Sequence, residues 1–192
     1  MNATQCVQTT LCQQAPIIID TTCSFEHERT ERWPKHATFR IDKRRIVKPD
    51  IVADARYLPF KSGVVDQLYC DPPHMYGAVS EQRIAKMDAA RLKTGRKAVN
   101  SFVRYSWWDT EEDWLNFVKA TDIEFHRVLK NNGLLFYKIT DGSKGTTKLS
   151  DLELMTHFDK KADKETYSLP FKRNIVHWLT FSPLSHTQPT NP

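Results

Sequence analysis

Glycine is scarce in this chain, and long apolar segments are missing. Only 6 of the 192 residues are glycine. No apolar run approaches the roughly 18 to 20 residues that a membrane-spanning helix needs, so the sequence predicts no membrane partner. The N-terminal stretch MNATQCVQTTLCQQAP lacks a basic start followed by an apolar core. It is therefore not a secretory signal peptide, and an intracellular, cytoplasmic location is expected.

The 4 cysteines stand singly along the chain, at Cys6, Cys12, Cys23 and Cys70. They form no CxxC pair, and no histidines stand near them at the spacing of a zinc site. The sequence therefore predicts no metal. Cys70 ends an apolar run and is expected to be a packing thiol rather than a nucleophile, while His126 is expected on the surface of a helix.

Composition favours one globular domain. The chain is 40% hydrophobic and long enough to bury a proper core. Its 28 lysines and arginines exceed its 23 acids, and the net charge of +5 leans toward polyanionic partners. We expect a flexible N-terminal arm over 1–15, a domain over 16–182 and a disordered tail over 183–192.

Short apolar runs that end on aspartate recur along the domain. They are PIIID (16–20), ATFRID (37–42), PDIVAD (49–54), VVDQLYCD (64–71) and GLLFYKITD (133–141). Such runs are typical of buried parallel strands. Open α/β sheets bind ligands at the carboxyl ends of their strands, so the aspartates are candidates for one crevice. The alternative for each aspartate is ordinary turn chemistry.

A helix is predicted between the fourth and fifth runs. DTEED (109–113) opens it, with Asp109 or Thr110 as N-cap, and apolar residues then recur at helical spacing. It is expected to stop at KNNG (130–133), with Gly133 as the cap. A short helix near 149–158 and an antiparallel pair, YSLPF and NIVHWLTF, would close the sheet. The predicted fold class is α/β.

The fourth run enters the sequence Asp71-Pro72-Pro73-His74. Two consecutive prolines have no backbone N–H groups and fix φ, so they end both helix and ladder. They leave a stiff corner with a carboxylate and carbonyl oxygens that, we expect, have no partner inside the chain. A donor from a ligand is the predicted partner.

The segments IVADARYLPFKSGVVDQLYCDPPH and EFHRVLKNNGLLFYKITD resemble class I S-adenosylmethionine-dependent methyltransferases. More narrowly, they are similar to small, phage-like amino-methyltransferases that carry a (D/N/S)PP(Y/F/W/H) motif. The resemblance covers roughly residues 16 to 182. It implies one Rossmann-like methyltransferase domain with a mostly parallel sheet, helices on both faces and an antiparallel C-terminal strand pair.

The resemblance also implies roles for the corner, whose catalytic residues would be Asp71, Pro72, Pro73 and His74. The Asp71 carboxylate and the Pro72 carbonyl would accept the two hydrogens of an exocyclic amine and free its lone pair. His74 would stack on the base that carries the amine. A base in duplex DNA would have to be flipped out of the helix to reach this corner.

For the cofactor S-adenosylmethionine, the resemblance implies three contacts. The loop after the first strand would hold the methionine portion, through Asp20, Thr21, Thr22, Cys23 and Ser24. Asp42 would accept from the ribose hydroxyls, and Asp54 with the Ala55 backbone would read the adenine ring. The sequence departs from the family pattern here, because the loop DTTCSFEHERTERW (20–33) contains no glycine. Glycine normally lets backbone approach a ligand closely.

Residues 75–108 form an insertion that is basic and aromatic. Its candidate nucleic-acid contacts are Arg83, Lys86, Arg91, Lys93, Arg96, Lys97, Arg104, Tyr105 and Trp107. Lys144, in the loop after the fifth run, could touch phosphate from the same edge. Basic and aromatic residues beside a catalytic corner favour strand binding and base stacking. The alternative is a solvated amphipathic helix with its apolar residues packed inward.

The resulting hypothesis is methylation of an exocyclic amine of a nucleic-acid base. Adenine N6 in DNA is preferred because, in the family that the sequence resembles, a motif opened by aspartate tends to go with that target. Alternatives are cytosine N4, an RNA base and a protein side-chain amide. A non-enzymatic alternative is a catalytically degenerate methyltransferase fold kept as a nucleic-acid-binding or partner subunit, which the glycine-free loop favours. A homodimer is plausible because so small a chain covers little nucleic acid.

Overall fold

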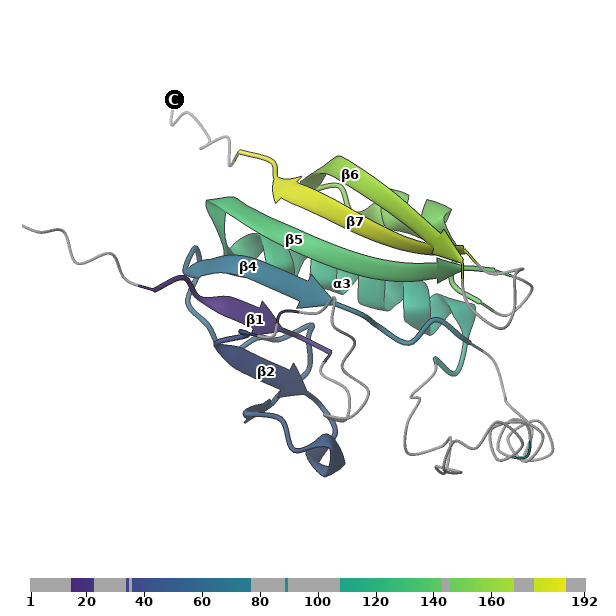
Figure 1. The fold of residues 1–192 in the computed structure, drawn as a ribbon, viewed down its shortest axis with the longest axis horizontal. Helices are drawn as coiled ribbons and strands as arrows, with labels where there is room; N and C mark the ends of the chain where they lie inside the picture. Colours follow the sequence, from purple (N-terminus) through teal and green to yellow (C-terminus); the bar gives the residue numbers. More distant parts are fainter. Residues whose placement is uncertain are drawn as a thin grey trace, which may run out of the picture.

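The computed structural model describes residues 15–22, 34, 36–76, 89, 108–142, 146–167 and 175–185. They form a seven-stranded sheet of order β3-β2-β1-β4-β5-β7-β6 (Figure 1). The strands are β1 (Ile18–Asp20), β2 (Phe39–Asp42), β3 (Ile51–Val52), β4 (Val65–Cys70), β5 (Leu129–Asp141), β6 (Phe158–Tyr167) and β7 (Ile175–Pro183). The helices are the 3₁₀ turns η2 (Arg45–Val47) and η3 (Leu149–Leu154) and the α-helix α3 (Glu111–Val128).

The sheet is mostly parallel. β1 pairs in parallel with β2 and β4, β2 with β3, and β4 with β5. β7 runs antiparallel to both β5 and β6. This α/β architecture, with an antiparallel strand pair at the C-terminal end, confirms the predicted fold class, and all five apolar runs contain strands.

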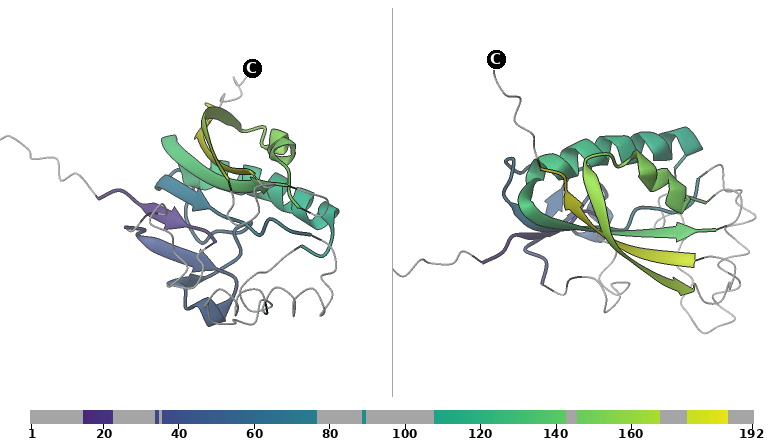
Figure 2. Two further views of the ribbon diagram at one scale, coloured as in Figure 1. Left: turned by 45° about the vertical axis from the view of Figure 1, so that its right-hand side comes forward. Right: turned by 90° about the horizontal axis from the view of Figure 1, so that it is seen from above.

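Helix α3 covers one face of the sheet (Figure 2). Its Trp114, Val118 and Phe125 are fully buried against the sheet, whose Leu68 and Leu135 are also fully buried. Burial of this apolar stripe, at roughly 25 cal/mol per Å², is the main force that holds the two layers together. The helical cover predicted for the second face does not fall within the described residues.

The predicted start of α3 is confirmed, and its predicted end is wrong. Thr110 is the N-cap and forms a capping box with Asp113. The helix ends at Val128 and the chain enters β5 at once. Gly133 therefore lies inside β5 rather than at a cap. A Cβ atom there would come within 3.0 Å of the Lys130 carbonyl oxygen and 3.2 Å of the Asp66 carbonyl oxygen, so close packing accounts for the glycine.

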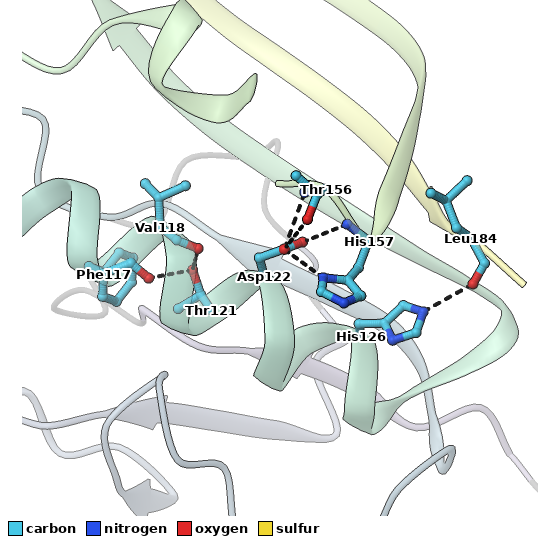
Figure 3. Close-up of polar contacts among 8 residues, drawn as sticks. All are labelled: Phe117, Val118, Thr121, Asp122, His126, Thr156, His157 and Leu184. Atoms are coloured by element: carbon cyan, nitrogen blue, oxygen red, sulfur yellow. Dashed lines mark hydrogen bonds and ion pairs between the residues drawn. The ribbon is translucent and has the colours of Figure 1, made fainter. Parts of the chain in front are cut away.

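A buried carboxylate ties α3 to the start of β6 (Figure 3). Asp122, 3% exposed, accepts hydrogen bonds from the backbone N–H groups of Thr156 and His157 and from the Thr156 hydroxyl. His157 Nδ1 lies 2.7 Å from Asp122 Oδ2. The neighbouring His126 was expected on the surface, but it is 8% exposed and bonds the Leu184 carbonyl oxygen.

The C-terminal pair exists, but its first strand is not where the sequence predicted it. β6 spans FDKKADKETY (158–167), and the predicted short helix near 149–158 is the 3₁₀ turn η3. The stretch YSLPF was predicted as this strand, and only its Tyr167 falls in β6. Because β6 forms the edge of the sheet, its lysines and acids face solvent, and the apolar alternation that marks a buried strand is missing.

Three further expectations fall on segments outside the described residues. They are the flexible arm over most of 1–15, the disordered tail from 186 on, and nearly all of the 75–108 insertion. In the part of the chain that the structure describes, no helix is both long enough and apolar enough to cross a membrane.

Candidate active site

The parallel strands bring the predicted aspartates to one edge of the sheet. Asp20 pairs in register with Tyr69, two residues before Asp71, and Asp42 pairs with Val52, two residues before Asp54. Since all these strands run in the same direction, the four carboxylates lie at the carboxyl ends of adjacent strands. The sequence prediction of one shared edge therefore agrees with the topology.

The Asp71 carboxylate is held on one side by a lysine of the neighbouring strand. Lys138 Nζ donates to Asp71 Oδ2 across 2.6 Å. The side chains of the pair are only 17% and 23% exposed for Lys138 and Asp71. Lys138 Nζ also lies 5.2 Å from the centroid of the Trp178 ring on β7, within cation–π range.

The other Asp71 oxygen is an unsatisfied acceptor. Asp71 Oδ1 is shielded from solvent and has no hydrogen-bond partner among the groups that the structure describes. Leaving a buried acceptor unpaired costs about 1–3 kcal/mol. An atom of this kind in a strand-end corner requires an explanation, and an N–H or O–H donor on a ligand supplies one.

The corner's main-chain carbonyls were expected to lack partners within the chain, and for several this is wrong. The Trp108 indole Nε1 donates to the Pro73 carbonyl oxygen at 2.8 Å. The Thr147 N–H donates to the His74 carbonyl oxygen, and the Trp108 N–H to that of Met75. Donors from the segments around Trp108 and Thr147 thus satisfy the carbonyl oxygens of Pro73, His74 and Met75.

His74 folds back onto the corner. Its Nδ1 lies 3.2 Å from the Pro72 carbonyl oxygen, and because a carbonyl only accepts, Nδ1 carries the proton and Nε2 is unprotonated when the ring is neutral. Burial lowers the pKa of His74; the nearby Asp71 opposes this shift and Lys138 adds to it. The ring is therefore neutral at physiological pH.

The glycine-free loop after β1 holds the corner through its threonines. The Thr21 N–H and hydroxyl both donate to the Tyr69 carbonyl oxygen, at 2.9 and 3.0 Å. The Thr22 hydroxyl accepts from the Asp71 N–H at 2.6 Å, while the Thr22 N–H donates to Asp20 Oδ1 at 3.2 Å. The two predicted cofactor-binding threonines therefore also fix the last residues of β4.

Asp42 and Asp54 each pair with an arginine two residues later. Arg44 donates to Asp42 from its backbone N–H, Nε and Nη2, at 2.8, 3.0 and 2.8 Å. Arg56 makes the same three contacts with Asp54. Burial alone would raise the pKa of Asp54, but its hydrogen bonds with Arg56 outweigh burial and the net pKa is lowered. A carboxylate offers about four acceptor positions, so these hydrogen bonds from described residues fill three on each.

Several predicted site residues lie outside the described residues. They are Cys23, Ser24, Arg83, Lys86, Arg91, Lys93, Arg96, Lys97, Arg104, Tyr105, Trp107 and Lys144. Of the remaining predicted residues, Ala55 is buried beside Asp54. Cys70 is fully buried, and burial raises the pKa of its thiol, which fits the packing role expected for it. Among the described residues no cluster of three potential metal ligands occurs.

Sequence reasoning missed two residues of the corner. Lys138 is a single charge within the apolar run GLLFYKITD, and a lysine in a buried strand calls for a partner on the adjacent strand. Its place beside Asp71 depends on the register of β4 and β5, which pairs Cys70 with Tyr137 and which the run ends alone do not show. Trp108 had no such signal, because its contact with Pro73 depends on how the chain returns from the insertion.

Neither family models nor curated proteins match this sequence. The chain is similar in structure to the PH0226 protein from Pyrococcus horikoshii OT3, whose crystal structure aligns with a TM-score of 0.51 at 12% identity. The alignment covers 91% of this chain and 84% of that chain. At this identity the likeness concerns the fold alone.

Proposed function

We propose that the protein transfers a methyl group from S-adenosylmethionine to an exocyclic amine of a nucleic-acid base, with adenine N6 in DNA as the preferred target. The observation that carries this proposal is the buried Asp71 Oδ1 of the Asp71–His74 corner, which has no hydrogen-bond partner among the described residues. A ligand N–H or O–H group could satisfy this acceptor, which lies at the edge where α/β sheets bind ligands.

The task of the corner is to hold an aromatic amine so that its nitrogen can react. The lone pair of such an amine is delocalised into the ring, which makes the nitrogen a poor nucleophile. Asp71 Oδ1 and the second lone pair of the Pro72 carbonyl oxygen accept its two hydrogens and draw the nitrogen toward tetrahedral geometry. Fixing the reactants in this way can supply about 7–11 kcal/mol of the barrier reduction. Asp71 Oδ1 then accepts the proton that the nitrogen loses.

The donor and acceptor set of the edge fits the proposed cofactor. When bound, S-adenosylmethionine supplies an electrophilic methyl group on a sulfonium. The fourth acceptor position of Asp42 would take a ribose hydroxyl, and that of Asp54 would take the adenine amine. Asp20, which is 8% exposed, and the Thr21–Thr22 backbone stand at the end of β1, where the methionine portion would lie.

Base recognition is supported by the half-buried Trp108 ring beside the corner. Trp108 packs on Phe117 and Trp114, with ring centroids 4.7 and 5.8 Å apart, and these two buried core rings hold it in place. Lys43 Nζ lies 5.9 Å from the centroid of the Trp108 ring, which adds a cation to the same edge. Aromatic and cationic groups together are typical of surfaces that bind flipped or single-stranded bases.

The arginine pairs favour one second candidate, a degenerate methyltransferase fold that binds nucleic acid without catalysis. Arg44 and Arg56 neutralise the two carboxylates that would hold adenosine, and the loop after β1 contains no glycine. Both features would weaken cofactor binding. Calorimetric titration with S-adenosylmethionine separates the two candidates, because the degenerate fold would bind none at millimolar concentration.

The direct test is transfer of isotope-labelled methyl groups to unmethylated duplex DNA, single-stranded DNA and bulk RNA. Each product is digested to nucleosides and analysed by mass spectrometry. Asp71→Ala should abolish transfer with cofactor affinity nearly unchanged. The matched control is Asp66→Ala, on the same strand about 16 Å away by strand geometry. Asp66 also pairs with a β5 lysine, Lys130, at 2.7 Å, but at the opposite end of the strand.

Labelled N6-methyladenosine or its deoxy form would support transfer to adenine and identify the sugar at the same time, whereas label at cytosine N4 would correct the target base. Cofactor binding without label on any nucleic acid would favour the alternative acceptor, a protein side-chain amide. Equal losses of activity in the Asp71 and Asp66 variants would show that the corner is misassigned. Absence of both transfer and cofactor binding would favour the degenerate fold.

A further inference from the structure

Lys138 is the β5 residue whose ammonium contacts the Asp71 carboxylate. The register of β4 and β5 pairs Cys70 with Tyr137, so the next residues, Asp71 and Lys138, are neighbours. On its other side, Lys138 pairs in register with Trp178 of β7. Its ammonium lies between a carboxylate oxygen at 2.6 Å and an indole ring at 5.2 Å.

Both neighbours of the ammonium are themselves fixed. The Trp178 Nε1 donates to the Thr166 hydroxyl of β6 at 3.2 Å, so the indole is anchored to the next strand. The Asp71 N–H donates to the Thr22 hydroxyl of the loop after β1. The Lys138–Asp71 ion pair is therefore part of a row of contacting side chains that crosses the sheet. In this respect it differs from an exposed ion pair on the surface.

The contact divides the carboxylate into two unlike oxygens. Oδ2 accepts from Lys138, while Oδ1 is buried and unpaired among the described groups. A substrate donor therefore finds one open acceptor in a fixed orientation. The pair Asp71–Lys138 also has no net charge, and the ammonium would repel a second cation brought to Oδ1.

We propose that Lys138 is a positioning residue that holds Oδ2 of Asp71, presents Oδ1 to the substrate and restricts the acceptor to neutral amines, such as the amino group of a nucleobase. A lysine-like ammonium is excluded by the same charge. This inference rests on the proposed function for its catalytic part, but the exclusion of cations is a property of the corner itself.

The chain contains a matched control pair. Lys130 of β5 and Asp66 of β4 form the same kind of contact on the same two strands, at 2.7 Å. Lys130→Met and Lys138→Met thus each remove the lysine of a β4–β5 ion pair, one 40% exposed and far from the corner, the other 17% exposed and inside it. Lys138→Arg retains the charge, and Lys138→Gln retains a hydrogen-bond donor without the charge.

The first arm needs neither cofactor nor activity. Cofactor-free protein at pH 8 is titrated with n-butylammonium, a mimic of the lysine side chain, and binding is followed by NMR. Removing one partner of a largely buried pair leaves an uncompensated charge, so Lys138→Met and Lys138→Gln should bind the probe at least about tenfold more tightly than wild type. Lys138→Arg and Lys130→Met should not. The inference is overturned if neither uncharged variant gains binding, or if Lys130→Met gains as much.

The second arm measures methyl transfer to an adenine-containing oligonucleotide. Misplacement of a reactive group by about 1 Å can cost a hundredfold in rate, so Lys138→Met should lower kcat by roughly that factor while KM changes less than about threefold. Lys138→Arg should restore kcat to within about tenfold. Equal losses in the Lys130 and Lys138 variants would reveal a merely structural role. If wild type transfers to no nucleic acid, the proposed function fails, and the butylammonium arm still decides the role of Lys138.

Discussion

At the scale of single residues, the Asp71 corner depends on a tryptophan that sequence reasoning overlooked. The Trp108 indole satisfies the Pro73 carbonyl oxygen, so Trp108→Phe keeps an aromatic ring and removes the donor. We expect a loss of about 1 kcal/mol in the free energy of unfolding and a several-fold fall in kcat. Urea denaturation and the methyl-transfer assay measure the two effects.

Trp114→Phe is the matched control for this change, because the Trp114 Nε1 donates to Asp151 Oδ2 at the same 2.8 Å. Because Trp114 is fully buried and its bond is to a carboxylate, this change should destabilise the protein more than Trp108→Phe does, and it should leave kcat unchanged. If both variants lose activity equally, the Trp108–Pro73 bond has no special role in shaping the corner.

The contribution of His74 to the stability of the protein should depend on pH. Burial lowers its pKa in the folded protein, so between that pKa and the unfolded value near 6.5 the unfolded chain binds more protons. The contribution of His74 to stability is therefore fully present above pH 6.5 and declines as the pH falls below it. The stability of wild type relative to His74→Phe should decrease from pH 7.5 to pH 5.5 in urea denaturation. A difference that stays constant, or that grows in acid, would contradict the assignment.

At the scale of elements, the sequence predicted correctly the features that depend on neighbouring residues in the chain. Short apolar runs that end on aspartate located all five parallel strands, and the capping residue Thr110 located the start of α3. The end of α3 was misplaced because KNNG matches a helix stop locally, whereas Gly133 is required by a close approach between β5 and β4. β6 was misplaced because it is an edge strand. Its charged side chains face solvent, so the sequence lacks the apolar pattern that marks a buried strand.

The same distinction holds for the site. Asp71, His74 and the strand-end aspartates could be predicted, because their positions follow from strand direction alone. Lys138 and Trp108 could not be assigned as readily, since their roles depend on register and on the return of the chain from an insertion. The pairing of Arg44 with Asp42 and of Arg56 with Asp54 depends on side-chain conformations, which sequence spacing does not determine.

The Asp122 contact makes a prediction about how α3 is joined to β6. Asp122→Ala would leave the N–H groups of Thr156 and His157 without their acceptor. Hydrogen bonds to a charged group contribute about 1.5–3 kcal/mol each, so we expect a loss of at least about 2 kcal/mol in the free energy of unfolding. Thr121→Val, one residue away, removes a hydroxyl that bonds only carbonyls of its own helix among the contacts drawn in Figure 3.

This control should cost less than about 1 kcal/mol, since the Phe117 and Val118 carbonyls already belong to the helix ladder. Thermal and urea unfolding of both variants test the comparison. Equal destabilisation would mean that packing on this face of α3, rather than the carboxylate, joins the helix to β6.

At the scale of the whole molecule, the net charge of +5 favours binding of polyanions, and the question is which surface they contact. If the insertion contacts nucleic acid, the triple variant Lys93→Gln, Arg96→Gln, Lys97→Gln should weaken binding and reduce the salt slope. Each lost phosphate contact lowers the magnitude of the slope by about 0.7–0.9, so the three together remove about 2–3. Fluorescence anisotropy of a labelled oligonucleotide between about 50 and 200 mM salt measures the slope.

A charge-matched triple on described surface separates local contacts from overall attraction. Lys119 on α3 and Lys160 and Lys161 on β6 are exposed and lie away from the carboxyl edge of the parallel strands. Changing all three to glutamine removes the same charge, and we expect an almost unaltered slope. If this triple lowers the slope as much as the insertion triple does, attraction is a property of net charge alone. That result would favour the alternative prediction, in which the insertion is a solvated amphipathic helix. Base recognition would then depend on the Trp108 ring and the adjacent Asp71–His74 corner.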